Sequence, residues 1–341
     1  MKPSLRVSVV LPCLNEERNL PRVLGALLAQ DLPSELYEVV VVDGGSTDRS
    51  VEIAESKGVR VIRAPRGVSV QRNHGAAETT GQVLAFLDSD CVAPTDWLSR
   101  GLHMVEGQGA ALAGGPALAP DGSGWIAKAW DTHMVTRQQR LVDDDDERFR
   151  LITTQNLFIR REVFEGVGGF DVSLVSGEDF FLCLQVADRG MPVGFDMEMT
   201  VAHLGVPHSA TAFFREQVWH SNREVWRRLS ERTGRPVGRS AYHYGRLTIA
   251  LLALLVVAGV LSVALQTIWP VIAAAAAYAA VPAALAARTS AWAGSAREIV
   301  PLTGMYAIYG LARAAYLLGL LRLEYRRSIP VDHAGGGPTG A

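Results

Sequence analysis

Two acidic residues separated by one position, Asp88 and Asp90, directly follow a run of apolar residues at 83–87. In an open α/β sheet, ligands bind beyond the carboxyl ends of the strands, so we expect both carboxylates at a site and not in a core. Two carboxylates held close together suit Mg²⁺ or Mn²⁺, which keeps its remaining coordination positions for water and phosphate. The alternative is an ordinary acidic turn, because Asp and Ser are common turn residues.

The chain before these acids shows the pattern of elements that would position them. Apolar, β-branched runs alternate with amphipathic stretches, and the connections between them are short. This alternation predicts an α/β domain with a mostly parallel, Rossmann-like sheet and right-handed crossovers. We expect strands at 7–11, 37–42, 59–63 and 82–87, and helices that begin at Asn15, near Asp48 and at Ser69.

The stretch from 91 to 202 is less regular. We interpret residues 119–150 as a long, partly helical excursion over the site, since long insertions in compact domains tend to be functional or flexible. Trp125 and Trp130 in this excursion either stack on a sugar or lipid or pack in a core, and the sequence leaves both open. We expect strands at 110–118, 153–159, 193–195 and 200–202, and a helix from Gly177 onward.

Composition limits the classes of function. The chain has 341 residues, a formal net charge of −2 and 48% hydrophobic residues. A nearly neutral chain has no global basic field, so nucleic acid is not an expected partner. The three cysteines, Cys13, Cys91 and Cys183, are too far apart for a metal-binding pattern. We expect them to be small buried apolar residues in a reducing compartment.

Arginine and aromatic residues interleave between 211 and 246. Eight arginines accompany three glutamates in this stretch, and apolar residues recur at helical spacing. A basic amphipathic segment of this kind is typical of helices that lie on a membrane surface. The alternative is a charged helix that packs on the preceding domain. We favour the membrane surface because a long uncharged segment follows directly.

The C-terminal part of the chain is predicted to hold membrane helices. Residues 247–265 and 268–287 carry no charge and are long enough to cross about 30 Å of hydrocarbon. A third apolar segment at 299–321 contains Arg313, whose charge must face protein or reach the interface, so this segment either crosses or lies at the surface. The arginines before the first span place the preceding domain in the cytoplasm, as part of a multi-pass protein of the inner or plasma membrane.

Six short motifs occur in an order that points to a known family. They are Pro12-Cys13-Leu14-Asn15-Glu16, Asp43-Gly44-Gly45-Ser46, Gln71-Arg72-Asn73, Asp88-Ser89-Asp90, Gly168-Gly169-Phe170-Asp171 and Gly177-Glu178-Asp179. From about Val7 to Trp226 the chain resembles the family 2 inverting glycosyltransferases, which have the GT-A nucleotide-sugar fold. With the membrane segments, this resemblance divides the chain into a catalytic domain at 1–210, an interfacial region at 211–245, membrane helices at 246–325 and a disordered tail at 326–341.

The resemblance implies a binding site for a nucleotide-sugar donor. Asp43 would accept a hydrogen bond from a base N–H, and Arg72 would meet the base or the diphosphate. Two alternatives stay open: Glu16 as a helix-start acid favoured by the helix dipole, and Arg72 in a surface salt bridge. The implied donor-binding residues are Pro12, Asn15, Glu16, Asp43, Arg72, Asn73, Asp88 and Ser89.

The resemblance also implies a metal ion. Asp90 and Asp88 would hold Mg²⁺ or Mn²⁺, and Asp88 would contact the ribose or a metal-bound water. His203 matches a position at which relatives supply a further contact to the metal or phosphate, and His208 is a nearby competitor. The cation would neutralise the charge of the departing diphosphate.

Asp179 is the implied catalytic base. It would take the proton from an acceptor hydroxyl as that oxygen attacks the anomeric carbon, and Glu178 would hold or tune it. The alternative is that both acids are N-cap residues of a helix. Residues 153–156, on the preceding strand, would line the acceptor side.

One difference from the family's sequence motifs limits the kind of transfer that we expect. Processive members carry Gln-x-x-Arg-Trp after the catalytic domain, whereas this chain has Gln217-Val218-Trp219-His220-Ser221. We therefore expect transfer of a single sugar from a UDP- or GDP-sugar to a lipid-linked or lipid hydroxyl acceptor at the cytoplasmic leaflet. The alternatives are a polyprenyl-phosphate glycosyl synthase, whose acceptor is a phosphate, and a non-catalytic nucleotide-sugar-binding membrane scaffold. Self-association into a homo-oligomer stays open.

Overall fold

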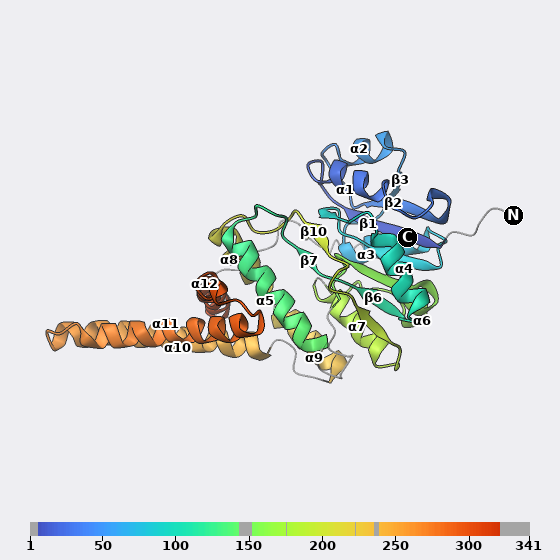
Figure 1. Cartoon of the computed structure of the whole chain (residues 1–341). Coiled ribbons are helices and arrows are strands. Elements are labelled where there is room, and N and C mark those ends of the chain that lie inside the picture. The colour runs from blue at the N-terminus through green and yellow to red at the C-terminus, as the bar shows by residue number, and fades with distance from the viewer. Residues whose placement is uncertain (1–5, 143–151, 175, 222, 235–238, 321–341) are drawn as a thin grey trace, which may run out of the picture.

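A computed structural model describes residues 6–142, 152–174, 176–221, 223–234 and 239–320. Its centre is a sheet with the strand order β3-β2-β1-β4-β8-β6-β9, and a smaller sheet, β5-β10-β7, lies beside it (Figure 1). The tail predicted at 326–341 and the four aspartates at 143–146 lie outside the described residues.

The parallel half of the main sheet follows the predicted alternation of strands and helices. The strands β1 and β2 run side by side with Val9 opposite Val39, and β4 flanks β1 on its other side with Ala85 opposite Val9. The elements are β1 (Val7–Cys13), α1 (Leu20–Leu27), β2 (Tyr37–Asp43), α2 (Ser50–Ser56), β3 (Arg60–Arg63), α3 (Val68–Ala77) and β4 (Val83–Phe86). The helix start expected at Asn15 is wrong, because Asn15 has a left-handed backbone with φ 57° and the helix begins at Leu20.

The second half of the sheet is mixed. The strand β8 (Leu157–Arg160) runs antiparallel to β4 and to β6 (Leu112–Gly114), and β9 (Val193–Phe195) runs parallel to β6. All other pairs in this sheet are parallel, so the expected fold class is confirmed. The expected strand at 153–159 begins only at Leu157, because residues 153–156 form a turn closed by Asn156 N–H and Thr153 O.

The single strand expected at 110–118 is wrong. The chain leaves the main sheet after Gly114, and Ala117–Leu118 forms β7 of the smaller sheet. A side chain at Gly115 would overlap the carbonyl of Met199, and Pro116 has no N–H for a sheet ladder. The smaller sheet is completed by β5 (Cys91–Val92) and β10 (Val201–His203).

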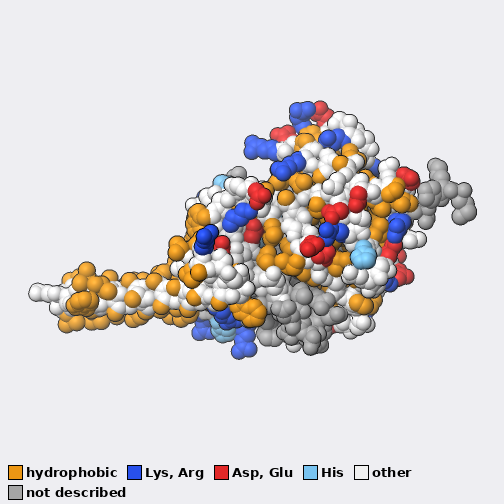
Figure 2. Space-filling model, viewed as in Figure 1, with side chains coloured by type: hydrophobic (Ala, Val, Ile, Leu, Met, Phe, Trp, Pro, Cys, Tyr) orange, Lys and Arg blue, Asp and Glu red, His pale blue; other side chains and the backbone are white. Residues whose placement is uncertain are grey.

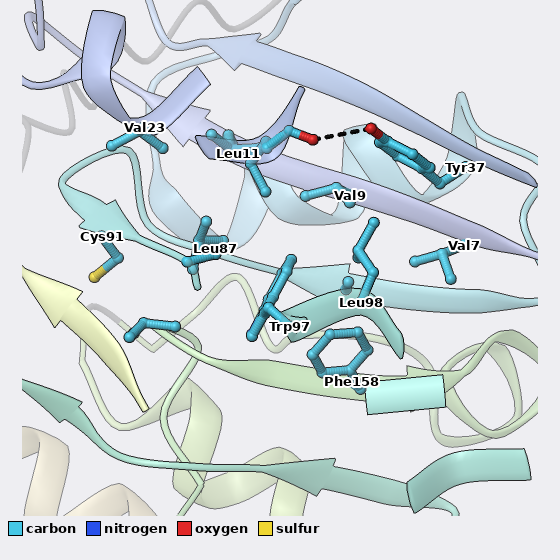
Figure 3. Close-up of a cluster of buried hydrophobic side chains, with 14 of the residues drawn as sticks. Val7, Val9, Leu11, Val23, Tyr37, Leu87, Cys91, Trp97, Leu98 and Phe158 are labelled. Atoms are coloured by element: carbon cyan, nitrogen blue, oxygen red, sulfur yellow. Dashed lines mark hydrogen bonds between the residues drawn. The ribbon is translucent and has the colours of Figure 1, made fainter. Parts of the chain in front are cut away.

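Apolar side chains fill both faces of the main sheet. On one face, Trp97 and Leu98 of α4 (Trp97–Leu102) pack against Phe158 and the β1 side chains (Figure 3). The Tyr37 hydroxyl in this layer donates a hydrogen bond to Leu27 O at 3.0 Å. Cys13, Cys91 and Cys183 are free and buried, as expected.

Helices make up most of the remaining described chain. They are η2 (His103–Gly107), α5 (Trp125–Val142), α6 (Arg161–Val167), α7 (Glu178–Ala187), α8 (Ala210–Trp219), α9 (Arg223–Thr233), α10 (Arg239–Ala264), α11 (Trp269–Trp292) and α12 (Ile299–Leu317), with short 3₁₀ turns at Ser34–Leu36 and Ala296–Glu298. The segment expected to be one basic amphipathic stretch therefore forms two helices and the start of a third. Part of the apolar side of α9 packs on protein, since Val225 contacts Leu174, Phe180 and Phe181.

The helices α10 and α11 form a hairpin that projects from the body of the protein (Figure 1). Both are long and apolar enough to cross a membrane, and they coincide with the two predicted spans. Hydrophobic side chains cover the projecting part, whereas the charged side chains visible in Figure 2 lie on the body and near the hairpin base.

The third apolar helix, α12, packs on the body as well as on the hairpin. Its Arg313 is buried, and it donates hydrogen bonds to Gln217 O at 3.0 Å and to Ser221 Oγ. The guanidinium also lies over the rings of Tyr309 and Trp226. The requirement that Arg313 face protein is therefore met.

Candidate active site

The loops after β1 and β2 are tied to each other by side chains. Asn15 Oδ1 accepts a hydrogen bond from Thr47 N–H at 2.8 Å, and Asn15 N–H donates to Ser46 Oγ at 3.0 Å. The buried Asp43 carboxylate accepts from Ser46 N–H at 2.9 Å and from Gly45 N–H at 3.2 Å. Asn15 and Asp43 thus hold these two loops together, and their contacts with a base stay predictions.

Two further expected donor-binding residues are close to these loops. Pro12 lies inside β1, opposite Val42. Glu16 is buried, its N–H donates to Ser50 Oγ at 2.8 Å, and its carboxylate accepts from Asn19 at 2.8 Å just before α1 begins. These contacts agree with a structural role for Glu16 at a helix start. Ser89 is also buried, between the two aspartates of its motif.

A buried arginine joins the two acidic motifs. Arg72 of α3 donates to Asp88 Oδ1 at 2.7 Å and to Glu178 Oε1 at 2.8 Å, although Glu178 is 106 positions away in sequence. Burial by itself lowers the pKa of Arg72, but Asp88 and Glu178 raise it above its ordinary value, so the guanidinium stays charged. The alternative of a surface salt bridge is wrong, because only 3% of the Arg72 side chain is exposed.

The Gly168-Gly169-Phe170 motif supports this arginine. Arg72 lies over the Phe170 ring at 5.6 Å, and the Phe170 ring packs on Phe86 of β4 at 5.0 Å. Asn73 holds the same turn, donating to Phe170 O at 2.8 Å and accepting from Phe170 N–H at 3.0 Å. The structure therefore gives Asn73 a positioning role; a contact with the donor stays a prediction.

Asp179 lies in the first turn of α7, beside Glu178. Burial, followed by the neighbouring Glu178 charge, raises the pKa of Asp179 to about 7, even though Phe180 N–H and Arg72 act in the opposite direction. The N-cap position is taken by Gly177, which has φ 78°, so the N-cap alternative for the two acids is wrong. A carboxylate with a pKa near neutrality suits a general base.

Asp90 and His203 meet through the smaller sheet. The antiparallel pairing of β5 and β10 places His203 opposite Cys91, and His203 Nε2 lies 3.5 Å from Asp90 Oδ2. Burial lowers the pKa of His203, but its hydrogen bond and proximity to Asp90 outweigh this and raise it. A Cβ at Gly205 would overlap Asp90 Oδ2, so the backbone of the loop after β10 closes tightly over this pair.

These residues have the donor atoms that a hard divalent cation needs. Asp90, Cys91 and His203 have potential ligand atoms within 4.8 Å of one another. Burial and Asp90 raise the pKa of the Cys91 thiol well above its ordinary value, so it stays protonated and leaves oxygen and nitrogen donors. That set fits Mg²⁺ or Mn²⁺. Asp88 lies outside this group and pairs with Arg72, so its contact with the metal or ribose stays a prediction.

The structure favours His203 over His208 as a metal ligand. His208 is exposed and belongs to no group of metal-capable side chains among the residues with described positions. His203 is partly buried, and the Gln155 amide nitrogen lies 3.2 Å from His203 Nε2. Gln155 belongs to the segment expected on the acceptor side, so this segment does reach the metal-capable residues.

Two polar residues of α5 beside the smaller sheet were missed by sequence reasoning. Asp131 Oδ2 on α5 accepts from Ala119 N–H at 3.0 Å, and Lys128 Nζ donates to Ala119 O at 3.2 Å. Burial raises the pKa of Asp131 to about 6. The signal was present in the sequence as polar residues opposite the apolar stripe of one helix. Trp130 is part of a core with Phe213, whereas Trp125 is half-exposed.

Fold and site together define a transferase of the GT-A type, with a Rossmann-like sheet and acidic motifs at its strand ends. Residues 8–168 match the family described as glycosyl transferase family 2. Glycosyltransferase AglE of Haloferax volcanii is 31% identical over 229 residues, which cover 64% of this chain and 74% of the relative. The chain belongs to glycosyl transferase family 2, and it is a glycosyltransferase.

Two other similar proteins extend this comparison. The glucosyl-dolichyl phosphate glucuronosyltransferase of Haloferax volcanii is 25% identical over 250 residues, which cover 67% of this chain and 77% of that protein. The mannosyltransferase PcManGT from Pyrobaculum calidifontis, solved in complex with GDP-Man and Mn²⁺, superposes with a TM-score of 0.61 at 18% identity. That match covers 93% of this chain and 88% of the other, so the likeness of fold extends beyond the residues 8–168 of the family match.

Proposed function

We propose that this protein is a membrane-anchored, metal-dependent inverting glycosyltransferase that transfers one sugar from a nucleotide-sugar donor to a lipid-linked or lipid hydroxyl acceptor. The observation that carries this proposal is the buried Arg72, which binds Asp88 and Glu178 at once. Through this arginine, the carboxylate expected at the donor and the residue beside the expected base belong to one site.

Asp90 and His203, together with Asp88, are the residues that would hold Mg²⁺ or Mn²⁺. When bound, such a cation neutralises the charge that develops on the departing diphosphate. The solved PcManGT complex contains Mn²⁺ and GDP-Man, which supports a divalent ion and a nucleotide-sugar donor for this chain too. Asn15 and Asp43, which hold the loops after β1 and β2, would contact the donor there.

Asp179 would accept the proton of the acceptor hydroxyl. With a pKa of about 7, its carboxylate is ionised in a large fraction of molecules at neutral pH and still basic enough to take a proton. Attack by the acceptor oxygen on the face opposite the diphosphate inverts the anomeric carbon. Glu178 and Arg72 hold the first turn of α7 while this occurs.

The acceptor class follows from the helical hairpin and from the relatives. The helices α10 and α11 have the length and composition of membrane spans. One relative is named for a glucosyl-dolichyl phosphate substrate, which is a lipid-linked sugar. The arginines that precede α10 favour a cytoplasmic catalytic domain at the inner or plasma membrane. These features support an acceptor presented at the cytoplasmic leaflet.

The test uses the full chain purified in detergent and reconstituted in lipid nanodiscs. Radiolabelled UDP- and GDP-sugars are supplied one at a time with Mn²⁺ or Mg²⁺ and a membrane lipid extract. We expect one donor to label the lipid fraction, and chelation of the metal to stop the labelling. If a donor of either class binds but no sugar is transferred, the scaffold alternative replaces this proposal, and if no donor binds, both are overturned.

A further inference from the structure

Helix α5 has two chemically different sides. Residues three or four positions apart lie on the same side of a helix, and one such stripe packs in the cluster formed with α8, α11 and α12. Lys128 and Asp131 lie on the opposite side. In Figure 1, α5 runs between the strands and the base of the α10–α11 hairpin. The residues of the packed stripe are Ile126, Ala129, Trp130 and His133.

Tyr306 of α12 connects α5 to the hairpin helices α10 and α11. His133 Nδ1 lies 2.8 Å from Tyr306 Oη, and Thr289 Oγ1 of α11 lies 2.7 Å from the same oxygen. The Tyr244 hydroxyl of α10 donates to Tyr306 O at 2.8 Å. Burial lowers the pKa of His133 to about 4, so its imidazole is neutral in this network. One tyrosine therefore contacts all three neighbouring helices.

The other side of α5 reaches the metal-capable residues. Asp131 and Lys128 both bind the backbone of Ala119, which directly follows β7. Since β7 pairs with β10 so that Leu118 lies opposite Ala202, Ala119 lies next to His203 in the adjoining strand. Adjacent strands are about 4.8 Å apart. Only Oδ2 of Asp131 has a hydrogen-bond partner within the described chain, so Oδ1 can still accept one.

We propose that Asp131 is a further substrate-binding residue, which accepts a hydrogen bond from a sugar hydroxyl beside His203, and that His133 and Tyr306 are positioning residues that hold it there. This inference rests on the proposed transfer reaction and adds a binding residue to it. The hydroxyl belongs either to the sugar of the donor or to the acceptor. A half-buried carboxylate with one unused oxygen is suited to either.

The decisive variants are Asp131→Asn, Tyr306→Phe and the double variant. Each is assayed as a full chain in nanodiscs with Mn²⁺ and the nucleotide sugar that is active in the donor test above. Tyr278→Phe on α11 is the matched control, because no hydrogen bond is described for its hydroxyl. We expect Asp131→Asn to raise one KM about 10-fold. If Asp131 binds a hydroxyl of the donor, the KM for the donor rises; if it binds a hydroxyl of the acceptor, the KM for the acceptor rises. Tyr306→Phe raises the same KM, Tyr278→Phe changes neither, and the double variant is no worse than Asp131→Asn alone.

Amide hydrogen exchange provides a readout that needs no metal, donor or activity. Exchange in the segment 119–134 becomes faster in Tyr306→Phe and stays unchanged in Tyr278→Phe. Unchanged exchange in Tyr306→Phe, additive losses in the double variant, or an Asp131→Asn protein with both KM values unchanged would overturn the inference. If the unmodified protein transfers no sugar at all, the proposed function fails, and the exchange measurement still decides whether Tyr306 holds α5.

Discussion

At the scale of single residues, one buried arginine and one buried carboxylate dominate the electrostatics of the site. Asp88 and Glu178 share the buried Arg72, whose single positive charge offsets part of theirs. Asp179 lies beside them and has no ion pair among the described residues, and burial raises its pKa to about 7. The site thus combines two acids that pair with an arginine and one acid, Asp179, that titrates near neutral pH.

Replacement of Asp179 by Asn tests its role as a base. For a hydroxyl acceptor, we expect kcat to fall by roughly 10²–10⁴, because the acceptor loses its proton acceptor in the transition state. Donor affinity, measured by calorimetry, should stay the same. A variant that retains most of its activity would contradict this role and would favour a phosphate acceptor, which needs no general base.

The pH dependence of kcat/KM has a definite sign. The pKa of Asp179 in the folded protein is about 7, and the ionised form is the active one. Below this value kcat/KM should rise about tenfold per pH unit, and above it the rate should level off. Steady-state rates between pH 5 and about 9 in mixed buffers of constant ionic strength measure the profile. A rate that is flat through pH 7 would exclude Asp179 as the titrating base.

Loss of the Arg72 charge should destabilise the fold. In Arg72→Gln, the buried Glu178 and the partly buried Asp88 lose their cation, which costs about 3–5 kcal/mol. Urea unfolding followed by tryptophan fluorescence measures the change. Arg49→Gln is the control, because its ion pair with Glu52 is exposed and should contribute little. Equal stability of the two variants would show that the ion pairs of Arg72 with Asp88 and Glu178 do not stabilise the fold.

At the scale of elements, the smaller sheet determines what lies next to the expected metal ligand. The strand β10 brings His203 to Asp90, and the loop after it passes so closely that only Gly fits at position 205. Two short strands and one glycine therefore shape the surroundings of Asp90, the last residue of the Asp88-Ser89-Asp90 motif.

Gly205→Ala is expected to weaken Mn²⁺ binding, since the added methyl group overlaps Asp90 Oδ2 and lies 3.0 Å from His203 Nε2. Changes next to metal ligands typically cost about 10–100-fold in affinity. Calorimetry with Mn²⁺ measures this effect. Gly166→Ala in α6 serves as the control, because its added methyl group meets no atom within 4 Å. Equal Mn²⁺ affinity in both variants would place the metal elsewhere.

At the scale of the whole molecule, the body and the projecting hairpin have opposite surfaces. The hairpin exposes large apolar residues such as Val256, Val260 and Val263, whereas α12 lies against the body. Exposed apolar area of this extent is unfavourable in water and is covered in a bilayer. This arrangement predicts two crossings, with the turn of the hairpin on the far side of the membrane.

Cysteine labelling tests these crossings. The three native cysteines are buried, so an introduced one can be labelled over a low background. In intact cells, an impermeant maleimide should label Ile268→Cys at the hairpin turn, and it should label Ala293→Cys at the hairpin base only after permeabilisation. Labelling of both positions from the same side would exclude a hairpin that spans the membrane.

Much of the fold and part of the site could be predicted because their signals are local in sequence. The alternation of apolar runs and amphipathic stretches indicates parallel strands, and the acids Asp43, Asp88 and Asp90 follow those runs directly. The uncharged segments indicate the two long helices for the same reason. Sequence patterns do not mark the boundaries where glycine and proline redirect the chain, as at Gly115 and Pro116 between β6 and β7.

The sequence by itself determined the family motifs, the acids at the strand ends and the apolar hairpin, since each depends on neighbours within a few positions. Only the tertiary structure decided that Arg72 binds both Asp88 and Glu178, that His203 and not His208 lies at Asp90, and that Asp131 reaches the same region. These contacts join residues far apart in the chain. They depend on strand register and helix packing, which no local pattern specifies.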